Sequence, residues 1–198
     1  MQLLPVGRDA VLVEVGSPEH AVSLATWARE RSLARDVVPG ARTVLLDGLT
    51  GSDRTELAGL LTSWRPTAGE PGPEVELAVT YDGPDLEVVA ERWGCEPGEV
   101  RSRHQATAFV SAFCGFAPGF AYLSGLEVEV PRLATPRTRV PAGSVAVAGT
   151  WCGVYPTDSP GGWRIIGRTE ADLWDPRRER PALLAPGTRV RFVDSGAS

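Results

Sequence analysis

Glycine and proline are distributed unevenly along this chain of 198 residues, and their distribution limits the possible folds more than any other feature. Residues 115–169 hold 15 glycines and prolines in 55 positions, whereas residues 21–64 hold five in 44. Both residue types favour turns and interrupt regular helices and strands. We therefore expect one half built from regular helices and strands, and one half in which short strands alternate with turns.

The first part of the chain alternates between short strands and amphipathic helices. Its strands are predicted from β-branched and apolar runs, and its helices from apolar residues at helical spacing behind a residue that can cap the helix. The predicted elements are strands at residues 10–15, 43–46 and 75–81, helices at 17–33 and 52–64, and a turn at 38–40. Their order predicts a small α/β sandwich over residues 1–78.

The second part, residues 79–198, begins with two helical segments and continues with brief apolar runs between turns. The helices are predicted at residues 84–93 and 97–103, and the apolar runs lie at 145–148, 154–155, 163–166 and 190–193. Short strands separated by frequent turns indicate a small β-barrel rather than a parallel sheet. The predicted fold class is therefore α+β, a sandwich followed by a barrel.

Charge and composition exclude several classes of function. All 20 basic residues are arginine, so a Schiff-base lysine, a P-loop lysine and a biotinylated lysine are excluded. The 25 acidic residues outnumber the basic ones, which argues against binding to nucleic acid. Three cysteines without C-x-x-C spacing and only two histidines predict free thiols and no metal site.

The sequence predicts neither a membrane span nor an export signal. Its apolar runs are all shorter than the ~18 residues that cross a bilayer. Residues 1–7 lack a basic region followed by a sustained apolar stretch, which is the pattern of a secretory signal. We therefore expect a cytoplasmic protein that does not bind a membrane.

Three turn-rich segments contain residue types that bind ligands. Residues 114–123 combine aromatic residues with glycine and proline, and form either a pocket wall or a tight turn over core aromatics. Residues 131–141 place three arginines among three prolines, which suits either a stiffened anion-binding loop or an exposed loop whose arginines offset nearby acids. Residues 159–169 form either an anion-holding glycine turn or a β-turn beside a packed tryptophan.

Few side chains are candidates for catalysis. His104 is either a general acid–base or a satisfied core histidine, since imidazole titrates near neutral pH. Cys114 and Cys152 could be nucleophiles paired with it, but neither lies in a sequence context that activates a thiol. No pair of acidic residues stands out for acid–base work or for binding Mg²⁺.

Three long motifs follow one another in the turn-rich half. They are F-x-G-F-A-P-G-F-A-Y-L-x-G-L at residues 113–126, P-R-x-A-T-P-R-x-R-V-P-A-G-S-V-A-V-A-G at 131–149, and G-V-Y-P-x-x-S-P-G-G-W-x-I-I-G-R-T at 153–169. Their order and spacing resemble the family of 5-oxoprolinase B subunits, and residues 81–86, His104 and residues 183–192 agree with it. The resemblance is strong over residues 80–193 and rests on the order of elements before that.

The resemblance implies a cyclophilin-like β-barrel and a polypeptide that is inactive alone. The B subunits of the family act with A and C subunits, and together they couple ATP hydrolysis to the opening of 5-oxo-L-proline into L-glutamate through a phosphorylated lactam. ATP would be shared with the partner subunits, and Mg²⁺ is expected. The chain also resembles KipI-type inhibitors of a histidine kinase and one half of the carboxyltransferase region of urea carboxylase, a biotin-dependent enzyme. Because a fold does not determine a function, both remain alternatives.

The positions of the motifs imply a set of site residues. Phosphorylation of an amide oxygen requires positive groups near the phosphate and the substrate carboxylate, which favours Arg132, Arg137 and Arg168. The catalytic candidates are His104, Arg137 and Arg168. The substrate-binding candidates are Pro118, Gly119, Phe120, Arg132, Ser144, Tyr155, Ser159 and Trp163. We expect the three segments to converge on one concave, anion-accepting surface that another polypeptide completes.

Overall fold

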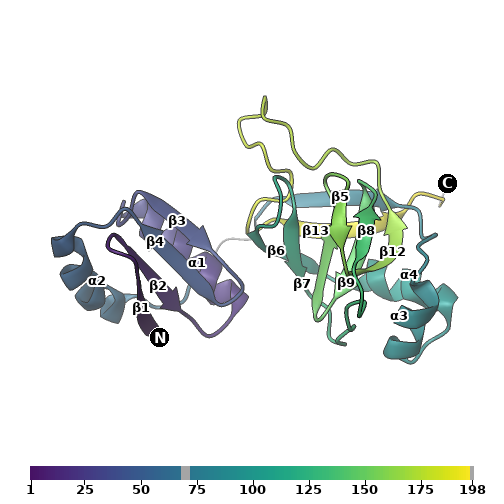
Figure 1. Ribbon diagram of the computed structural model, residues 1–198, viewed down its shortest axis with the longest axis horizontal. Helices are drawn as coiled ribbons and strands as arrows, with labels where there is room; N and C mark the ends of the chain where they lie inside the picture. Colours follow the sequence, from purple (N-terminus) through teal and green to yellow (C-terminus); the bar gives the residue numbers. More distant parts are fainter. Residues whose placement is uncertain (68–71, 197–198) are drawn as a thin grey trace. The chain divides into compact units, whose positions relative to one another are not determined.

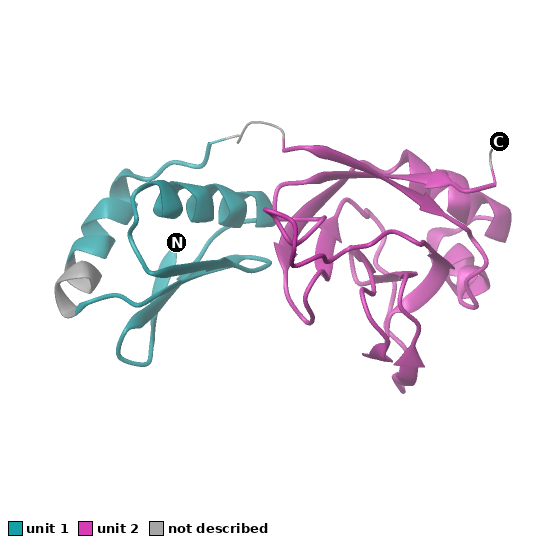
Figure 2. Cartoon of the chain, turned by 90° about the horizontal axis from the view of Figure 1, so that it is seen from above, with its two compact units in different colours: residues 1–70 teal, residues 71–198 magenta. Residues whose placement is uncertain are grey.

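The structure of the protein is a computed structural model that describes residues 1–67 and 72–196, with the backbone alone for residues 51–55. The chain divides into two compact units, residues 1–70 and 71–198 (Figure 2). The described helices are all too short or too polar to cross a bilayer. The predicted α+β fold class is confirmed: the first unit has the architecture of a sandwich and the second that of a barrel.

The first unit is a two-layer sandwich of one sheet and two helices (Figure 1). Its elements are β1 (Gln2–Val6), β2 (Ala10–Glu14), α1 (Pro18–Glu30), β3 (Asp36–Pro39), β4 (Thr43–Asp47) and α2 (Gly51–Ser63). The sheet has the strand order β1-β2-β4-β3, and every neighbouring pair is antiparallel. Alternate strand residues such as Val13 and Leu46 form one core cluster with Leu24 and Leu57 of the helices. Both helices therefore cover the same face of the sheet.

The start of α1 follows the local sequence closely. The Ser17 side chain accepts a hydrogen bond from the backbone N–H of His20 at 3.3 Å, and Pro18 occupies the first turn. The prediction that Ser52 and Asp53 cap α2 lies outside the described residues. The predicted turn at residues 38–40 was wrong, since residues 36–39 form the edge strand β3 against β4. Backbone pairing with a neighbouring strand overrides the turn preference of proline and glycine there.

The second unit is a nearly closed barrel with two helices. Its elements are β5 (Glu74–Val79), α3 (Leu86–Trp93), α4 (Pro97–Ala106), β6 (Phe109–Cys114), β7 (Ala121–Ser124), β8 (Arg137–Val140), β9 (Ser144–Ala148), β10 (Trp151–Val154), β11 (Ser159–Gly161), β12 (Arg164–Arg168) and β13 (Arg189–Asp194). Seven strands have the order β12-β9-β10-β7-β6-β13-β5, and β11 pairs separately with β8. Two backbone hydrogen bonds of 2.9 Å between Thr80 and Arg168 join the two edges of the sheet.

Strand β5 belongs to the barrel, although the sequence analysis assigned it to the first domain. It pairs in parallel with β13, from Glu74 opposite Arg189 to Val79 opposite Asp194. The division into units therefore falls before this strand, with residues 71–198 in the second unit, whereas the predicted boundary followed residue 78. The apolar alternation of a strand predicts that it pairs, but a partner more than 100 residues away is not visible in the local sequence.

Both faces of the barrel sheet are covered by apolar side chains. Val145 and Val147 of β9 point into the main core, whereas Ala146 between them joins a second cluster. On β12, Ile166 belongs to the main core and Ile165 to the second cluster. This alternation follows from the two-residue period of a strand. The second cluster is largely aromatic, and it carries the candidate site.

Candidate functional site

An aromatic cluster covers the outer face of the barrel sheet; we define it as Phe116, Phe120, Tyr122, Tyr155 and Trp163. Phe120 lies at its centre, with ring centroids 5.2 Å from Phe116, 5.5 Å from Tyr155 and 5.4 Å from Trp163. All three pairs meet edge to face, the arrangement that the charge distribution of aromatic rings favours. The cluster joins the first and third motifs, which lie far apart in the sequence.

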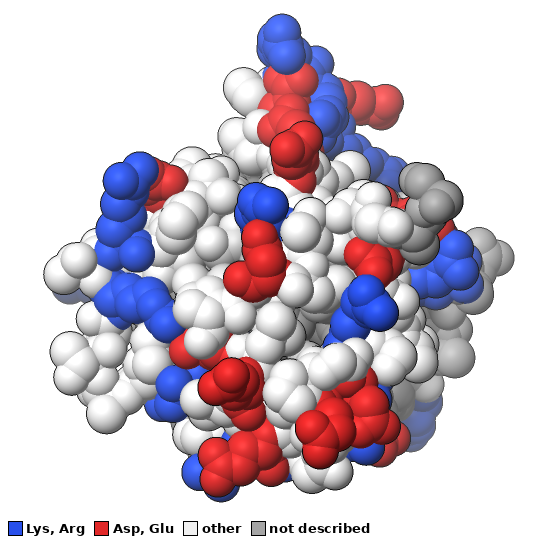
Figure 3. Space-filling model, turned by 90° about the vertical axis from the view of Figure 1, so that its right-hand side faces the viewer, with Lys and Arg blue, Asp and Glu red and all other residues white. Residues whose placement is uncertain are grey.

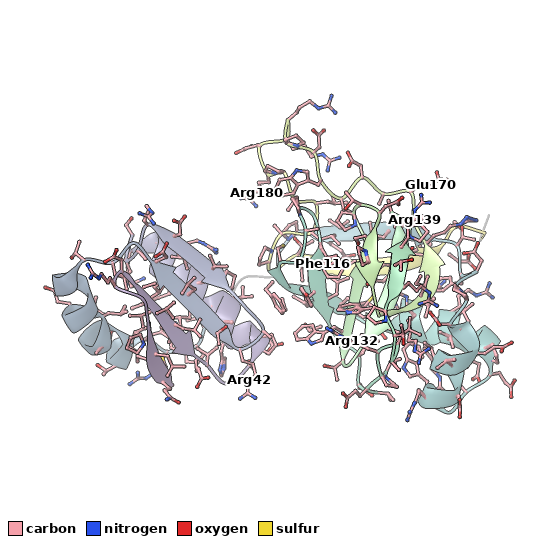
Figure 4. The ribbon with its side chains drawn as sticks, in the orientation of Figure 1. Arg42, Phe116, Arg132, Arg139, Glu170 and Arg180 are labelled. Carbon is pink, nitrogen blue, oxygen red and sulfur yellow. The ribbon has the colours of Figure 1, made fainter. Side chains whose placement is uncertain are left out.

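Two glycines let the aromatic rings reach these positions. Gly119 has a φ of +87°, and a Cβ there would lie 2.9 Å from the Cβ of Trp174. A Cβ at Gly161 would overlap the Tyr155 hydroxyl. Phe116 also has a positive φ, +70°, which is rare for a bulky residue, and its side chain remains 59% exposed. The turn thus presents an exposed aromatic ring at the edge of the buried cluster (Figure 4).

Arg132 lies against the aromatic cluster. Its guanidinium carbon is 5.9 Å from the centroid of the Trp163 ring, within the range of a cation–π interaction. The residue is exposed and forms no ion pair with a described carboxylate. Other exposed arginines of the unit do form such pairs, for example Arg168 with Asp82 at 3.1 Å. Basic and acidic side chains are also interspersed on the face that Figure 3 shows.

A buried carboxylate holds two further arginines beside the cluster. Asp85 lies 3.0 Å from the Arg137 guanidinium and 3.6 Å from that of Arg164, and its Oδ2 accepts the backbone N–H of Ile165 at 2.7 Å. Arg137 also donates to the carbonyl oxygen of Trp163 at 3.4 Å. We call Asp85, Arg137, Arg164 and the Ile165 N–H the Asp85 network.

Positive charge exceeds negative charge among these groups. Arg132, Arg137 and Arg164 supply three guanidiniums against the single carboxylate of Asp85, in a chain whose net charge is −5. Burial raises the pKa of the Tyr155 hydroxyl, whereas a hydrogen bond from the Trp163 backbone and the charges of Arg132 and Arg137 oppose this rise. Both guanidiniums therefore act on the same hydroxyl. The arrangement can bind a small anion that has a flat apolar part.

The three motifs meet on this face. The backbone N–H of Leu133 donates to the carbonyl of Gly162 at 2.8 Å, and β8 of the second motif pairs with β11 of the third. Phe116 and Phe120 of the first motif contact Tyr155 of the third. Phe120, Arg132, Arg137, Tyr155 and Trp163, all predicted site residues, are therefore close together.

The remaining substrate-binding candidates lie around the cluster in turns and edges. Pro118 is exposed in the turn before Gly119. The Ser144 hydroxyl donates to the Pro141 carbonyl at 2.7 Å and so stabilises the turn before β9. The Ser159 hydroxyl is buried and has no hydrogen-bond partner among the described residues. Arg168, a catalytic candidate, is exposed at the far end of β12 from Arg164, where it pairs with Asp82.

His104 is enclosed in the barrel core rather than exposed on the aromatic face. Its Nδ1 lies 2.8 Å from the Tyr81 hydroxyl and its Nε2 lies 3.3 Å from the Cys152 sulfur. Full burial lowers its pKa to about 3, so the ring is neutral at pH 7. Burial likewise raises the pKa of the Cys152 thiol. These contacts describe a satisfied core histidine, the second of its two predicted roles.

Asp85 and Phe116 also belong to the site, although neither was among the residues predicted from the sequence. Asp85 stands at the N-cap position of α3, where an aspartate normally binds the first turn, yet its side chain makes no capping bond. Its carboxylate instead reaches residues more than 50 positions away. Phe116 lies inside the first motif, and the glycines around it were the available signal of an unusual backbone. The described residues contain no group of three or more His, Cys, Asp or Glu that could hold a metal ion.

Comparison with known proteins identifies close relatives. The family model "Carboxyltransferase domain, subdomain C and D" matches residues 1–184. The 5-oxoprolinase B subunit of Haemophilus influenzae is 41% identical over 99% of this chain and 99% of its own length. That of Escherichia coli O157:H7 is 39% identical over 95% of this chain and 93% of its own.

Solved structures share the fold. The crystal structure of TTHA0988 aligns with 96% of this chain at 35% identity and a TM-score of 0.78. This chain spans only 40% of TTHA0988, which is therefore much longer. Kluyveromyces lactis urea carboxylase aligns with 97% of this chain, which covers 21% of that protein, at a TM-score of 0.69. Its 18% identity shows a likeness of fold alone.

Proposed function

Because the chain belongs to the family of the carboxyltransferase domain, subdomains C and D, we propose that it is the B-type component of an ATP-dependent 5-oxoprolinase. The complex would convert 5-oxo-L-proline to L-glutamate together with A-type and C-type subunits. Two relatives named as B subunits of 5-oxoprolinase align with almost the whole of this chain and almost the whole of their own length, which supports the proposal. The greater length of TTHA0988 agrees with a chain that works next to further polypeptide.

The observation that carries the proposal is the pairing of unneutralised positive charge with aromatic rings on one face. 5-Oxoproline is a small five-membered lactam that carries one carboxylate. Guanidinium groups bind carboxylates through charge-assisted hydrogen bonds. A flat apolar ring can lie against the exposed ring of Phe116, which meets the buried ring of Tyr155 edge to face. The aromatic cluster and its arginines thus match both parts of the molecule.

The chemistry assigns this chain a binding role rather than a nucleophilic one. An amide is a poor electrophile, and ATP would activate it by transferring its γ-phosphoryl group to the lactam oxygen. Water then adds to the ring carbon and the ring C–N bond breaks, which leaves the γ-acyl phosphate of glutamate. A second water hydrolyses this acyl phosphate to L-glutamate and inorganic phosphate. The residues of the aromatic face would orient the lactam and keep its carboxylate fixed during these steps. ATP and Mg²⁺ would be held mainly by the partner subunits, because this chain has no lysine and its described residues form no acidic metal cluster.

Reconstitution tests the proposal directly. The purified chain is mixed with the A-type and C-type subunits of the same organism, and glutamate formation from 5-oxoproline is measured with and without ATP. We expect glutamate only when all three proteins and ATP are present. The complete set of E. coli A, B and C proteins serves as the positive control for the assay. If that control forms glutamate and the complex with this chain does not, the proposal is wrong, and the kinase-inhibitor and carboxyltransferase alternatives become the leading ones.

A further inference from the structure

The three arginines beside the aromatic cluster differ in whether their guanidinium groups are free to bind a ligand. Resting on the proposed function, we propose that Arg132 contacts the substrate carboxylate and that Asp85 and Arg137 are positioning residues that hold the Arg132–Trp163 pair in place. Arg137, a catalytic candidate from the sequence, then acts through Trp163 and does not touch the substrate.

Arg132 has an exposed guanidinium group, and hydrogen bonds fix the backbone on either side of it. Its guanidinium is exposed and forms no ion pair with a described carboxylate. The residues on either side of Arg132 are bound to β12 and to the residues just before it: Arg164 Nε donates to the carbonyl of Pro131 at 3.2 Å, and the N–H of Leu133 donates to the carbonyl of Gly162 at 2.8 Å. A cation on a backbone held at both sides loses less entropy when it binds an anion.

Arg137 is already occupied by partners of the protein itself. Its guanidinium lies 3.0 Å from Asp85, whose side chain is only 7% exposed, and it also donates to the Trp163 carbonyl. A substrate carboxylate would have to displace a mostly buried carboxylate from its ion pair, which is unfavourable because the displaced charge stays in a poorly hydrated place. The guanidinium is therefore better suited to support the site than to bind the ligand.

The Asp85 network holds the two peptide groups that follow Trp163. Arg137 donates to the carbonyl of Trp163, and Asp85 accepts the N–H of Ile165, two positions further along the chain in β12. Arg164, between them, connects Asp85 to Pro131. Loss of Asp85 would loosen the backbone next to Trp163, on whose ring the Arg132 guanidinium lies, and would remove the ion pair of Arg164, which binds the Pro131 carbonyl. Asp85 and Arg137 thus determine where the free cation stands.

A double-mutant cycle in the reconstituted complex tests this division of roles. The variants are Arg132→Ala, Asp85→Asn, Arg137→Ala and the combinations of each of the last two with Arg132→Ala. We measure kcat, the KM values for 5-oxoproline and ATP, and the midpoint of thermal unfolding. Arg139→Ala is the matched control, because Arg139 lies in the same segment and pairs with the exposed Asp158 at 2.6 Å. It should leave all four quantities unchanged.

We expect Arg132→Ala to raise the KM for 5-oxoproline by about tenfold to a hundredfold, the loss typical of a charge-assisted hydrogen bond, without changing the KM for ATP or the unfolding midpoint. Arg132→Lys should restore part of the affinity because the charge returns. Asp85→Asn and Arg137→Ala should also raise this KM, but only while Arg132 is present. In the Arg132→Ala background they should add nothing to the KM, whereas their effect on unfolding should persist.

Three results separate the possible failures. If the wild-type complex forms no glutamate, the proposed function itself is wrong. If it is active and Arg132→Ala leaves the KM unchanged, Arg132 does not contact the substrate. If Arg137→Ala raises the KM equally in both backgrounds, Arg137 binds the substrate itself, and the positioning role is wrong. Should Asp85→Asn or Arg137→Ala fail to fold, Arg137→Lys replaces them, since a lysine keeps the charge near Asp85 but cannot bridge it to the Trp163 carbonyl.

Discussion

Replacing Asp85 by alanine should lower the free energy of unfolding of the second unit by about 3 kcal/mol. Removal of one partner of a buried ion pair costs about 3–5 kcal/mol, because the other charge stays uncompensated. The lower end of that range applies here, since the side chains of Arg137 and Arg164 are 28% and 18% exposed and can regain some water. The substitution also leaves the N–H of Ile165 without its acceptor.

Replacing Asp85 by asparagine separates the contribution of the charge from that of the hydrogen bond. An asparagine oxygen can still accept the Ile165 N–H, so only the charge and its attraction to Arg137 are removed. Hydrogen bonds to a charged group contribute about 1.5–3 kcal/mol, and neutral ones about 1 kcal/mol. Asp85→Asn should therefore lower the free energy of unfolding by about 1–2 kcal/mol, less than Asp85→Ala does.

Urea unfolding followed by tryptophan fluorescence measures these differences, because four of the six tryptophans lie in the second unit. The matched control is Asp82→Ala. Asp82 lies three residues away and pairs with Arg168, but both side chains are at least half exposed, so its loss should cost less than about 1 kcal/mol. If Asp85→Ala unfolds at the same urea concentration as Asp82→Ala, the Asp85 network does not stabilise the barrel and the reasoning fails.

Further outcomes follow from the buried groups and the glycine turns. Burial lowers the pKa of His104 to about 3, so as the pH falls from about 6.5 towards 3 the imidazole gains a proton in the unfolded chain but not in the folded one. The free energy of unfolding should therefore fall by up to about 1.4 kcal/mol per pH unit in that window. In urea unfolding, a His104→Gln variant should show a shallower dependence of this free energy on pH. Gly119→Ala should lower the free energy of unfolding more than Gly94→Ala does in the same assay, because both glycines have a positive φ but only a Cβ at Gly119 would contact other atoms. Equal losses of stability would show that the backbone conformation alone matters. Iodoacetamide should leave Cys152 unmodified in the folded protein, as read by mass spectrometry, because burial raises the pKa of its thiol; rapid alkylation would mean that the barrel opens.

The architecture could be predicted because it depends on local properties. The serine cap and the proline at the start of α1 affect only the neighbouring residues. The apolar alternation of β9 is likewise visible within five consecutive residues. The dense turns after residue 115 shorten the strands wherever they pair. The partner of β5 could not be predicted, because a strand at the end of one unit has the same pattern as a strand that begins the next.

The sequence predicted which segments form the candidate site, but not the role of each residue in it. The three motifs marked the segments that meet, and Phe120, Arg132 and Trp163 are close together there. The sequence could not separate Arg132 from Arg137, since both follow a proline in the same arginine-rich loop. Their difference arises from Asp85, which stands 52 residues before Arg137 in the chain.

The sequence by itself determined an α/β unit followed by a turn-rich barrel, a chain without lysine chemistry, and three motifs rich in glycine, arginine and aromatic residues. Tertiary structure alone decided which charges are neutralised, because an ion pair depends on where the fold brings two distant side chains. The fold pairs Asp85 with Arg137, whereas the Arg132 guanidinium stays exposed to solvent beside the Trp163 ring. It also enclosed His104 in the core, where burial keeps the imidazole neutral.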